Sequence, residues 1–496
     1  MAANLGDIIP APLSVDPDPG GDFTIDSATV IARSGGSEAA SVSDWLAELL
    51  RHGTGFALPV VAGAARAGSV IALELGDADS SLGDEGYRLA VRPGSLVIRA
   101  AAGAGLFHGA ETLRQLLPAG IETAGGRGPW IVSGGQIVDR PRYPWRGAML
   151  DVARHFFSVA DVERYIDEIA LYKINILHLH LTDDQGWRIA INGWPQLTAV
   201  GGSTEVGGGI GGYYTQDQYR QIVAYAASRY VTVVPEVDGP GHVNAALASY
   251  PELTCSGTAP PLYTGLDVGF SSLCVGKAVT YRFLDDVLGQ LAAMTPGPYI
   301  AIGGDEAKST PPEDYVAFIE KAVQIVAAHG KTAVGWSEMA AVPLPSGSGI
   351  VAEYWDTSDY GESLRTAVQD DVRIVLAPGN RAYLDQKYDD NTTLGLVWAG
   401  PTSVETAYDW DPTSYQVPAG QVEGVEAPLF SETLTTMSDI EQMAFPRLPG
   451  IAEIGWSPQS THDWSSYRLR LAAQAPRWEA MNLDFYRSPE VSWPAG

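Results

Sequence analysis

Between about residues 146 and 448 the sequence repeats an order of strand, loop and helix, and few folds are compatible with that order. Short apolar runs typical of buried strands alternate with amphipathic segments typical of helices. The predicted strands are 146–152, 174–181, 230–237, 299–302, 332–336, 349–355, 372–376 and 424–430. The predicted helices include 158–172, 215–228, 279–294, 313–329, 359–368 and 438–448. Eight strands, mostly followed by helices, predict an α/β fold, a (β/α)8 TIM barrel.

The competing fold is a doubly wound open sheet. Such a sheet normally carries a glycine-rich phosphate-binding loop after its first strand. The first predicted strand here runs into Leu150-Asp-Val-Ala-Arg-His155, which is not such a loop. We therefore favour the barrel over the open sheet.

The barrel is predicted to occupy residues 140–496 and to follow a small α+β domain at residues 1–139. A Gly/Pro-rich connection near 118–129 separates the two patterns, and residues 1–20 are predicted to lie extended on the surface. No chemical motif occurs in the first domain, so we interpret it as a scaffold. Its predicted elements are helices 41–52 and 105–117 and strands 69–75, 87–91 and 95–100, the last two forming a hairpin.

Charge and hydropathy exclude two classes of partner. The net charge of −28 disfavours nucleic acid, whose phosphates would be repelled. No stretch approaches eighteen consecutive apolar residues, so we expect no membrane span. The 13 tryptophans exceed what an ordinary core needs and point weakly to carbohydrate, with large core side chains as the alternative.

The chain has two cysteines, Cys255 and Cys274, in one Gly/Pro/Thr-rich stretch. A disulfide closing that loop would stabilise the fold by roughly 3 kcal/mol, and two unrelated thiols are the alternative. A bridge indicates an oxidising compartment and hence secretion. The first residues carry no basic and apolar leader pattern, so secretion requires that a signal peptide has been removed.

The stretch 299–306, Tyr-Ile-Ala-Ile-Gly-Gly-Asp-Glu, is the strongest chemical signal in the sequence. Two glycines let backbone and ligand approach closely where the buried strand ends. Asp305 and Glu306 then stand side by side, and neighbouring side chains of an extended segment point in different directions. We expect them to address two different atoms of one ligand. The alternative is an N-cap with a first-turn acid of the next helix.

Polar and aromatic residues follow the other predicted strands as well. Because the carboxyl ends of barrel strands form one face, these side chains should surround a single site. Surface charge alone could supply the acids, but not tryptophan at two consecutive strand ends. The residues are Asp151, Arg154, Asp183, Asp184, Trp187, Arg188, Glu236, Asp238, His242, Trp336, Trp355, Tyr383, Asp385 and Glu432.

His178 and His180 have the spacing of a metal-binding pair, since residues i and i+2 share one face of a strand. A metal-dependent barrel hydrolase needs further histidine ligands on later strands, and only His242 is well placed. We therefore expect no metal and no cofactor. The histidines are predicted to lie within the barrel or to orient Asp183.

Acids, an arginine and an aromatic wall describe a sugar-hydrolysing site. A glycosidase needs a proton donor near the leaving oxygen and a second group for the cationic transition state. An ionised Asp305 beside Glu306 should raise the pKa of Glu306, as a general acid requires.

At this point four motifs resemble one family. They are Ile302-Gly-Gly-Asp-Glu306, His178-Leu-His-Leu-Thr-Asp-Asp-Gln-Gly-Trp187, Arg146-Gly-Ala-Met-Leu-Asp-Val-Ala-Arg154 and Pro235-Glu-Val-Asp-Gly-Pro-Gly-His242. Together they resemble glycoside hydrolase family 20, the β-N-acetylhexosaminidases, in their bacterial form. The resemblance covers nearly the whole chain, including the small first domain.

The resemblance implies retaining, substrate-assisted catalysis, in which the 2-acetamido oxygen of the sugar attacks the anomeric carbon and gives an oxazolinium intermediate. Glu306 would protonate the leaving oxygen and later activate water. Asp305 would hold the acetamido nitrogen, and Tyr383 would aim its oxygen. Asp183 and His242 would form a hydrogen-bonded group behind Glu306.

The resemblance also implies the residues that bind the sugar. Trp336 and Trp355 would wall the acetamido pocket, Trp398 would flank the ring, and Arg154, Asp385 and Glu432 would bind hydroxyl groups. Phe430 stands where the family usually has tryptophan, so the floor under the sugar would be phenyl instead of indole. That change should weaken stacking and leave the chemistry unaltered.

The leading prediction is an exo-acting enzyme that removes terminal non-reducing GlcNAc or GalNAc from chitooligosaccharides or glycans. The alternatives are a disaccharide-releasing enzyme of the same family, a carbohydrate-binding barrel without catalysis, and a metal-dependent hydrolase. The predicted partner is the carbohydrate alone, and oligomeric state is not predicted.

Overall fold

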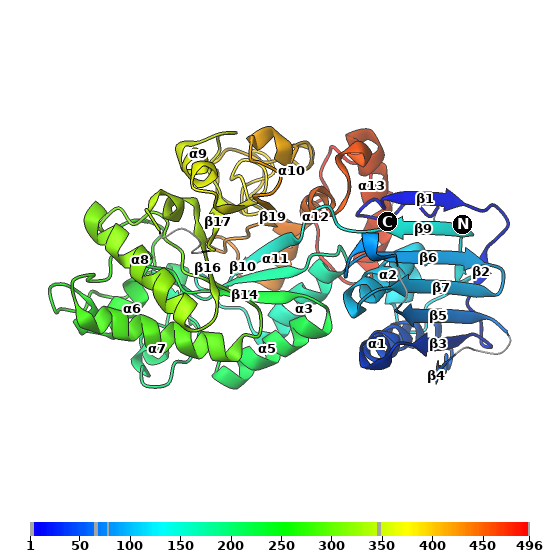
Figure 1. Cartoon of the computed structure of the whole chain (residues 1–496), viewed down its shortest axis with the longest axis horizontal. Coiled ribbons are helices and arrows are strands. Elements are labelled where there is room, and N and C mark those ends of the chain that lie inside the picture. Colours follow the sequence, from blue (N-terminus) through cyan, green and yellow to red (C-terminus); the bar gives the residue numbers. More distant parts are fainter. Residues whose placement is uncertain (1–3, 64–67, 77–78, 345–348, 495–496) are drawn as a thin grey trace.

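The computed structural model describes residues 4–63, 68–76, 79–344 and 349–494. A sheet domain built from the N-terminal part of the chain packs against one end of a barrel, as Figure 1 shows in blue and in green to orange. None of the helices in these residues is long and apolar enough to cross a membrane.

Within the described ranges, eight parallel strands close into a barrel in chain order, and the last pairs with the first. They are β10 (Trp145–Asp151), β11 (Ile176–His180), β14 (Thr232–Glu236), β15 (Tyr299–Ala301), β16 (Thr332–Trp336), β17 (Val351–Tyr354), β18 (Arg373–Leu376) and β19 (Val422–Ala427). Each predicted strand overlaps one of these, so the barrel prediction is confirmed.

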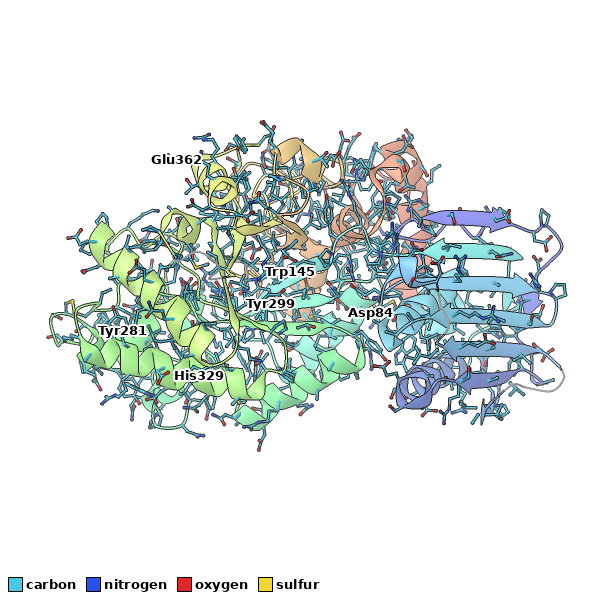
Figure 2. The ribbon with its side chains drawn as sticks, in the orientation of Figure 1. Asp84, Trp145, Tyr281, Tyr299, His329 and Glu362 are labelled. Carbon is cyan, nitrogen blue, oxygen red and sulfur yellow. A yellow bond between two sulfur atoms is a disulfide. The ribbon has the colours of Figure 1, made fainter. Side chains whose placement is uncertain are left out.

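An apolar layer fills the barrel near the amino ends of its strands. The rings of Trp145 and Tyr299, both labelled in Figure 2, meet edge to face with centroids 5.1 Å apart. The same layer contains Ile176, Val234, Ala301, Val334, Val351 and Val375. Because this end is closed by hydrocarbon, the polar side chains of the strands gather at the carboxyl end.

Five of the predicted barrel helices are present with small shifts at their ends. Ser158 and Thr215 begin two of them as reciprocal capping boxes, which explains where those helices start. The helices are α3 (Val159–Ala170), α5 (Gln216–Ser228), α7 (Ala278–Met294), α8 (Pro312–Ala328) and α9 (Glu362–Gln369). Shorter elements between strands are β12 (Thr182–Asp183), β13 (Gly186–Trp187), α4 (Gln196–Ala199), α6 (Asn244–Ser249) and α10 (Val404–Tyr408).

The single helix predicted at 438–448 is wrong. The chain forms two helices there, α11 (Met437–Ala444) and α12 (Leu448–Trp456). Pro446 lies between them, and proline lacks the N–H that a continuous helix needs.

In the described residues the first domain is α+β, as predicted, and contains a seven-stranded mixed sheet, a separate two-stranded sheet and two α-helices. Helix α1 (Gly36–Thr54) packs on the sheet, and α2 (Gly103–Leu116) is buried almost all round because it lies between the sheet and the barrel. The predicted hairpin is the antiparallel pair β6 (Tyr87–Arg92) and β7 (Ser95–Ala100). The other strands are β1 (Ser14–Pro17), β2 (Phe23–Thr24), β3 (Val30–Ser34), β4 (Val60–Ala62), β5 (Val70–Leu75), β8 (Ile131–Val132) and β9 (Gly135–Asp139).

The prediction that residues 1–20 lie on the surface is wrong for much of that segment, of which residues 1–3 fall outside the described ranges. Leu5, Ile8 and Ile9 are buried in the core. The prediction holds for Ser14–Pro17, which are extended and mostly exposed as strand β1 and pair with β9 at the edge of the sheet. The apolar side chains outweigh the Pro/Asp/Gly composition that suggested a surface segment.

Helix α13 (Trp464–Ala480) was not predicted, and its internal Pro476 explains why. It packs against the first domain, although it belongs to the predicted second one. Arg477 makes an ion pair with Glu122 and donates hydrogen bonds to the carbonyls of Gln115 and Leu117. The two predicted domains are therefore joined by the C-terminal helix as well as by the chain between β9 and β10.

Candidate active site

A cavity of about 360 Å³ lies at the carboxyl ends of the barrel strands. Its wall contains every residue predicted from the sequence to catalyse or to bind sugar, except Asp183, which lies behind it. The lining residues are Arg154, His242, Leu266, Val268, Asp305, Glu306, Trp336, Trp355, Tyr383, Asp385, Leu396, Trp398, Phe430 and Glu432. The structure thus brings together side chains that follow seven of the eight barrel strands, with further lining residues from two long loops.

The two glycines before Asp305 allow the backbone to turn directly after β15. Gly303 and Gly304 have φ angles of 67° and 97°, a region that favours glycine. A Cβ atom on Gly303 would lie 1.7 Å from Oδ1 of Asp238, so no larger residue fits. The close contact at Gly303 is thus with Asp238, and the predicted approach of a ligand to these glycines stays a prediction.

His242 faces both adjacent acids. Its Nε2 lies 3.3 Å from Oδ2 of Asp305 and 3.6 Å from Oε2 of Glu306, without an aligned hydrogen bond to either. On the other side of the ring, Nδ1 lies 3.1 Å from Oδ1 of Asp183. Asp183 and His242 therefore do stand behind Glu306, as predicted, and His242 also contacts Asp305, which the sequence did not indicate.

The predicted rise in the pKa of Glu306 is wrong for this structure. The contact with His242 is the main cause that lowers the pKa of Glu306, and Lys308, whose Nζ lies 3.0 Å from Oε1, adds to it against the effect of burial. Two cationic partners outweigh the neighbouring carboxylate. Sequence adjacency identified the acid pair but not the cations around it.

Arg154 anchors the opposite side of the site. Its guanidinium lies 2.7 Å from Asp183, 3.3 Å from Asp151 and 3.9 Å from Glu432. Burial alone would raise the pKa of Asp183, but the charges of Arg154 and His242 hold it well below its usual range. Asp183 is therefore a fixed anion that orients both of these side chains.

Three buried carboxyl oxygens in the wall have no hydrogen-bond partner among the described residues. They are Oδ1 of Asp305, Oδ1 of Asp385 and Oε2 of Glu432. Burial, with the charge of Glu432 second, raises the pKa of Asp385 to about 8. A buried oxygen without a partner costs free energy, and a bound molecule with O–H or N–H groups would remove that cost.

Aromatic rings cover much of the remaining wall. Tyr383 stacks on Phe430 with centroids 5.7 Å apart, and Trp398 meets both Tyr383 and Trp355 edge to face. The indole rings of Trp336 and Trp355 are fixed by hydrogen bonds to buried acids. Nε1 of Trp336 donates to Glu236, and Nε1 of Trp355 donates to Glu338. Such faces suit the C–H surface of a sugar ring.

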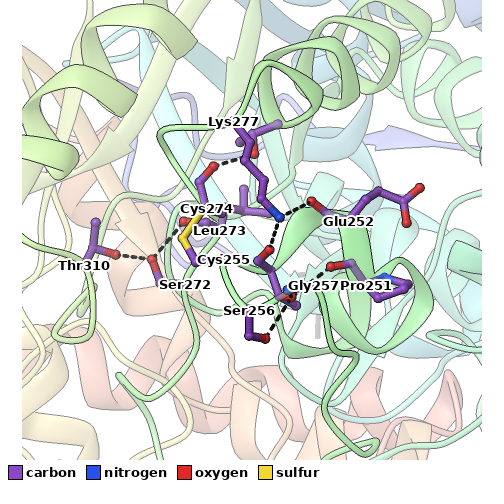
Figure 3. The surroundings of a disulfide bond; sticks show 12 residues. Pro251, Glu252, Cys255, Ser256, Gly257, Ser272, Leu273, Cys274, Lys277 and Thr310 are labelled. Atoms are coloured by element: carbon purple, nitrogen blue, oxygen red, sulfur yellow. Dashed lines mark hydrogen bonds between the residues drawn. A yellow bond between two sulfur atoms is a disulfide. The ribbon is translucent and has the colours of Figure 1, made fainter.

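Leu266 and Val268 also line the cavity and were missed in the sequence. They lie in the loop closed by Cys255 and Cys274, which form a disulfide in the structure. Figure 3 shows how the base of this loop is held, with Lys277 donating to the carbonyls of Glu252 and Thr254. The Gly/Pro/Thr-rich composition of the loop offers no signal that would have marked these two apolar residues as part of a site.

His178 and His180 lie inside the barrel, as predicted, and His180 contacts Asp183. Glu236 was noted at a strand end but not assigned a role, and it lies between the two histidines. Glu338, which follows Trp336 by two residues, was missed. Its position after a strand end was the signal that could have found it.

Family models match both parts of the chain. Glycosyl hydrolase family 20, catalytic domain, matches residues 143–316 and 311–459. Glycosyl hydrolase family 20, domain 2, matches residues 6–140.

Individual proteins match over almost the entire sequence. A β-N-acetylhexosaminidase of Cellulomonas fimi is 41% identical over 489 residues, covering 98% of this chain and 97% of its own. The structure of a family 20 β-N-acetylhexosaminidase from Streptomyces coelicolor A3(2) is 54% identical, with a TM-score of 0.96 over 99% of this chain and 100% of its own. A mutant Streptomyces plicatus β-hexosaminidase in complex with the product GlcNAc is 55% identical, with a TM-score of 0.95 over 100% and 99% of the two chains.

Proposed function

We propose that this chain, which belongs to glycosyl hydrolase family 20 and is a β-N-acetylhexosaminidase, removes single terminal GlcNAc or GalNAc residues by retaining, substrate-assisted catalysis. The natural substrates are chitooligosaccharides or glycans with a non-reducing N-acetylhexosamine end. The observation that carries the proposal is the arrangement of Asp305, Glu306 and Tyr383 around one small cavity with tryptophan walls.

The size of the cavity supports an exo mode of action. At about 360 Å³ it stands near the lower end of the range for ligand-binding pockets. A larger hollow of about 930 Å³ adjoins it and shares Glu306, Trp355 and Trp398 with it. One sugar in the smaller cavity would therefore direct its leaving group past Glu306 into the larger hollow.

The substrate's acetamido group acts as the nucleophile in this proposal. As its oxygen attacks the anomeric carbon, Glu306 transfers a proton to the leaving oxygen and the glycosidic bond breaks. Asp305 accepts the acetamido N–H and stabilises the positive charge of the oxazolinium. Tyr383 donates to the acetamido oxygen; burial raises the pKa of Tyr383, which keeps the phenol protonated. Glu306 then takes a proton from the water that opens the oxazolinium.

A paired assay tests the mechanism. We expect cleavage of an aryl N-acetyl-β-glucosaminide and no measurable cleavage of the matching aryl β-glucoside, because only the first carries the nucleophile. Equal rates on both would mean that a protein carboxylate attacks the sugar, and the roles of Asp305 and Tyr383 would be wrong. The same assay in excess chelator should proceed at full rate, which separates this mechanism from a metal-dependent one.

The two remaining alternatives give other results in the same experiments. A disaccharide-releasing enzyme would cleave an aryl disaccharide and leave the aryl monosaccharide intact. A barrel that binds carbohydrate without catalysis would retain GlcNAc in equilibrium dialysis and cleave neither substrate.

Phe430 allows a test of the prediction that its aromatic ring stacks under the bound sugar. Its ring lies under Arg154, whose guanidinium carbon is 5.1 Å from the ring centroid, and it packs against Trp336 and Tyr383. We expect Phe430→Trp to lower KM about three- to tenfold, since the larger face buries more of the sugar's C–H surface. Steady-state kinetics on the aryl substrate measures this, with Phe430→Leu as the matched control that should raise KM. A higher KM in Phe430→Trp would mean that the site has no room for indole.

We also propose that the enzyme is secreted. The bonded pair Cys255 and Cys274 supports an oxidising compartment, because such bridges rarely persist among cytosolic thiols. Expression of the encoding gene with fractionation of the culture tests this directly. Activity confined to the cell interior would contradict it.

A further inference from the structure

A chain of alternating imidazoles and carboxyl groups runs through the barrel to the acid pair. We call it the histidine–carboxylate chain, and its members are Glu426, His178, Glu236, His180, Asp183 and His242. Nδ1 of His178 lies 2.7 Å from Glu426, and its Nε2 lies 3.0 Å from Glu236 without an aligned hydrogen bond. Nδ1 of His180 contacts the same oxygen of Glu236, and its Nε2 lies 3.0 Å from Asp183. His242 continues the chain from Asp183 to Asp305 and Glu306.

Every ring nitrogen in the histidine–carboxylate chain faces a carboxyl oxygen. A neutral imidazole has one N–H and one lone pair, so it can satisfy only one of two ionised carboxylates. A doubly protonated ring satisfies both. The geometry therefore favours imidazolium cations alternating with carboxylate anions. Consistent with this, the carboxylates Glu236 and Asp183 raise the pKa of His180 to about 9, against the effect of burial.

The histidine–carboxylate chain is closed to solvent except at the acid pair. His178, His180, Glu236, Asp183 and His242 are each at most 2% exposed. The side chain of Glu306, by contrast, is 24% exposed. A proton that leaves the chain or enters it therefore passes through the Glu306 end.

Other charged groups face the histidine–carboxylate chain and contribute to its net charge. Around His242 these are Asp184, 4.0 Å from Nδ1, and Asp238, whose pKa burial and the charge of Asp305 raise well above its usual range. Arg154 faces Asp183, and Asp151 acts on His180. Glu353 lies 3.5 Å from His178 at the inner end, and Lys308 faces Glu306 at the outer end.

We propose that His180 and Glu236, which lie deeper in the histidine–carboxylate chain, are positioning residues that set how tightly His242 holds the proton used by Glu306. The inference rests on the proposed function, because it assigns Glu306 as the acid. When sugar binds, the N–H bond at Nε2 of His242 breaks and an O–H bond forms on Glu306. His242 becomes neutral and keeps its Nδ1–H on Asp183. Glu306 gives that proton to the leaving oxygen, later takes one from the attacking water, and shares it again with His242.

The sign of the expected effect follows from charge. Replacing His180 by glutamine removes a cation near Asp183 and leaves Glu236 with His178 as its one imidazolium neighbour in the histidine–carboxylate chain, so the net charge near His242–Glu306 becomes more negative and the pair holds its proton more tightly. In His180→Gln the alkaline limb of the pH profile of kcat/KM should move up by about one pH unit. The double variant His180→Gln/Glu236→Gln removes one charge of each sign. The alkaline limb of its pH profile should therefore return most of the way to the wild-type position.

The assay uses the aryl N-acetyl-β-glucosaminide and the full chain. His108→Gln is the matched control. His108 is also buried and lies 3.1 Å from a carboxylate, that of Glu85, but it belongs to helix α2 of the first domain and not to the histidine–carboxylate chain. In His108→Gln the alkaline limb of the pH profile of kcat/KM should stay at the wild-type position. A purely structural role predicts that the double variant is worse than either single variant and that no limb moves; that result would overturn the proposal. If the wild-type enzyme cleaves no substrate, the proposed function itself has failed, which is a distinct outcome.

A second measurement needs no active variant. In wild-type protein labelled with ¹⁵N-histidine, His178 and His180 should each show two ring N–H groups at pH 7, assigned from the loss of signals in His→Gln variants. A single N–H on either ring would mean a neutral imidazole and would contradict the alternation of imidazolium and carboxylate in the histidine–carboxylate chain.

Discussion

Glu306→Gln should reduce kcat/KM on an unactivated substrate such as a chitooligosaccharide by about 10³–10⁴-fold. The amide has the shape of the carboxyl group but cannot transfer a proton, and general acid catalysis is worth about that much. Steady-state kinetics should show a smaller loss on an aryl glycoside with a good leaving group, because its leaving oxygen needs little protonation. The difference between the two losses identifies Glu306 as the acid.

Glu313 supplies the control for this substitution. It lies exposed in the first turn of α8, seven residues along the chain from Glu306, and Glu313→Gln should leave both rates unchanged. Equal losses on the two substrates in Glu306→Gln would show that the side chain positions the sugar and donates no proton to it.

Asp305→Asn should reduce kcat by about 10²–10³-fold while KM changes little. The asparagine can still accept the acetamido N–H, but it carries no charge to stabilise the oxazolinium, and loss of one such electrostatic contact costs about 3 kcal/mol in the transition state. The variant should also lose affinity for a thiazoline analogue of the intermediate, measured as an inhibition constant.

The matched control for Asp305→Asn is Asp217→Asn, an exposed acid at the start of α5 that pairs with Arg220. It should behave as wild type in both assays. Asp305→Asn with an unchanged kcat would remove the acetamido group from the mechanism, whatever the effect of Glu306→Gln.

The barrel was predictable because its strands are short buried runs, and burial in a parallel sheet leaves a strong sequence signal. The same regularity located the site, since residues such as Trp336 and Trp355 follow strand ends and those ends meet on one face. Asp305 and Glu306 were found for the same reason.

Long-range contacts account for what the sequence did not reveal. The pKa of Glu306 falls because of His242, which arrives from another strand end, and Lys308, which has no motif of its own. Leu266 and Val268 reach the cavity from an irregular loop. Helix α13 was hidden by Pro476, whose local preference is overruled by packing against the first domain.

The contacts between the chain's distant segments have a consequence for its synthesis. The N–H of Ala11 donates to Glu453, and Arg470 donates to the carbonyl of Ile8, across 442 and 462 residues of sequence. At ribosomal speeds of about 5–20 residues per second, Ile8 and Ala11 wait on the order of 20–90 s for these partners. During that interval the nascent sheet domain must leave buried polar groups open to water or to a chaperone. The first domain therefore cannot complete these contacts until residues 453 and 470 have been synthesised.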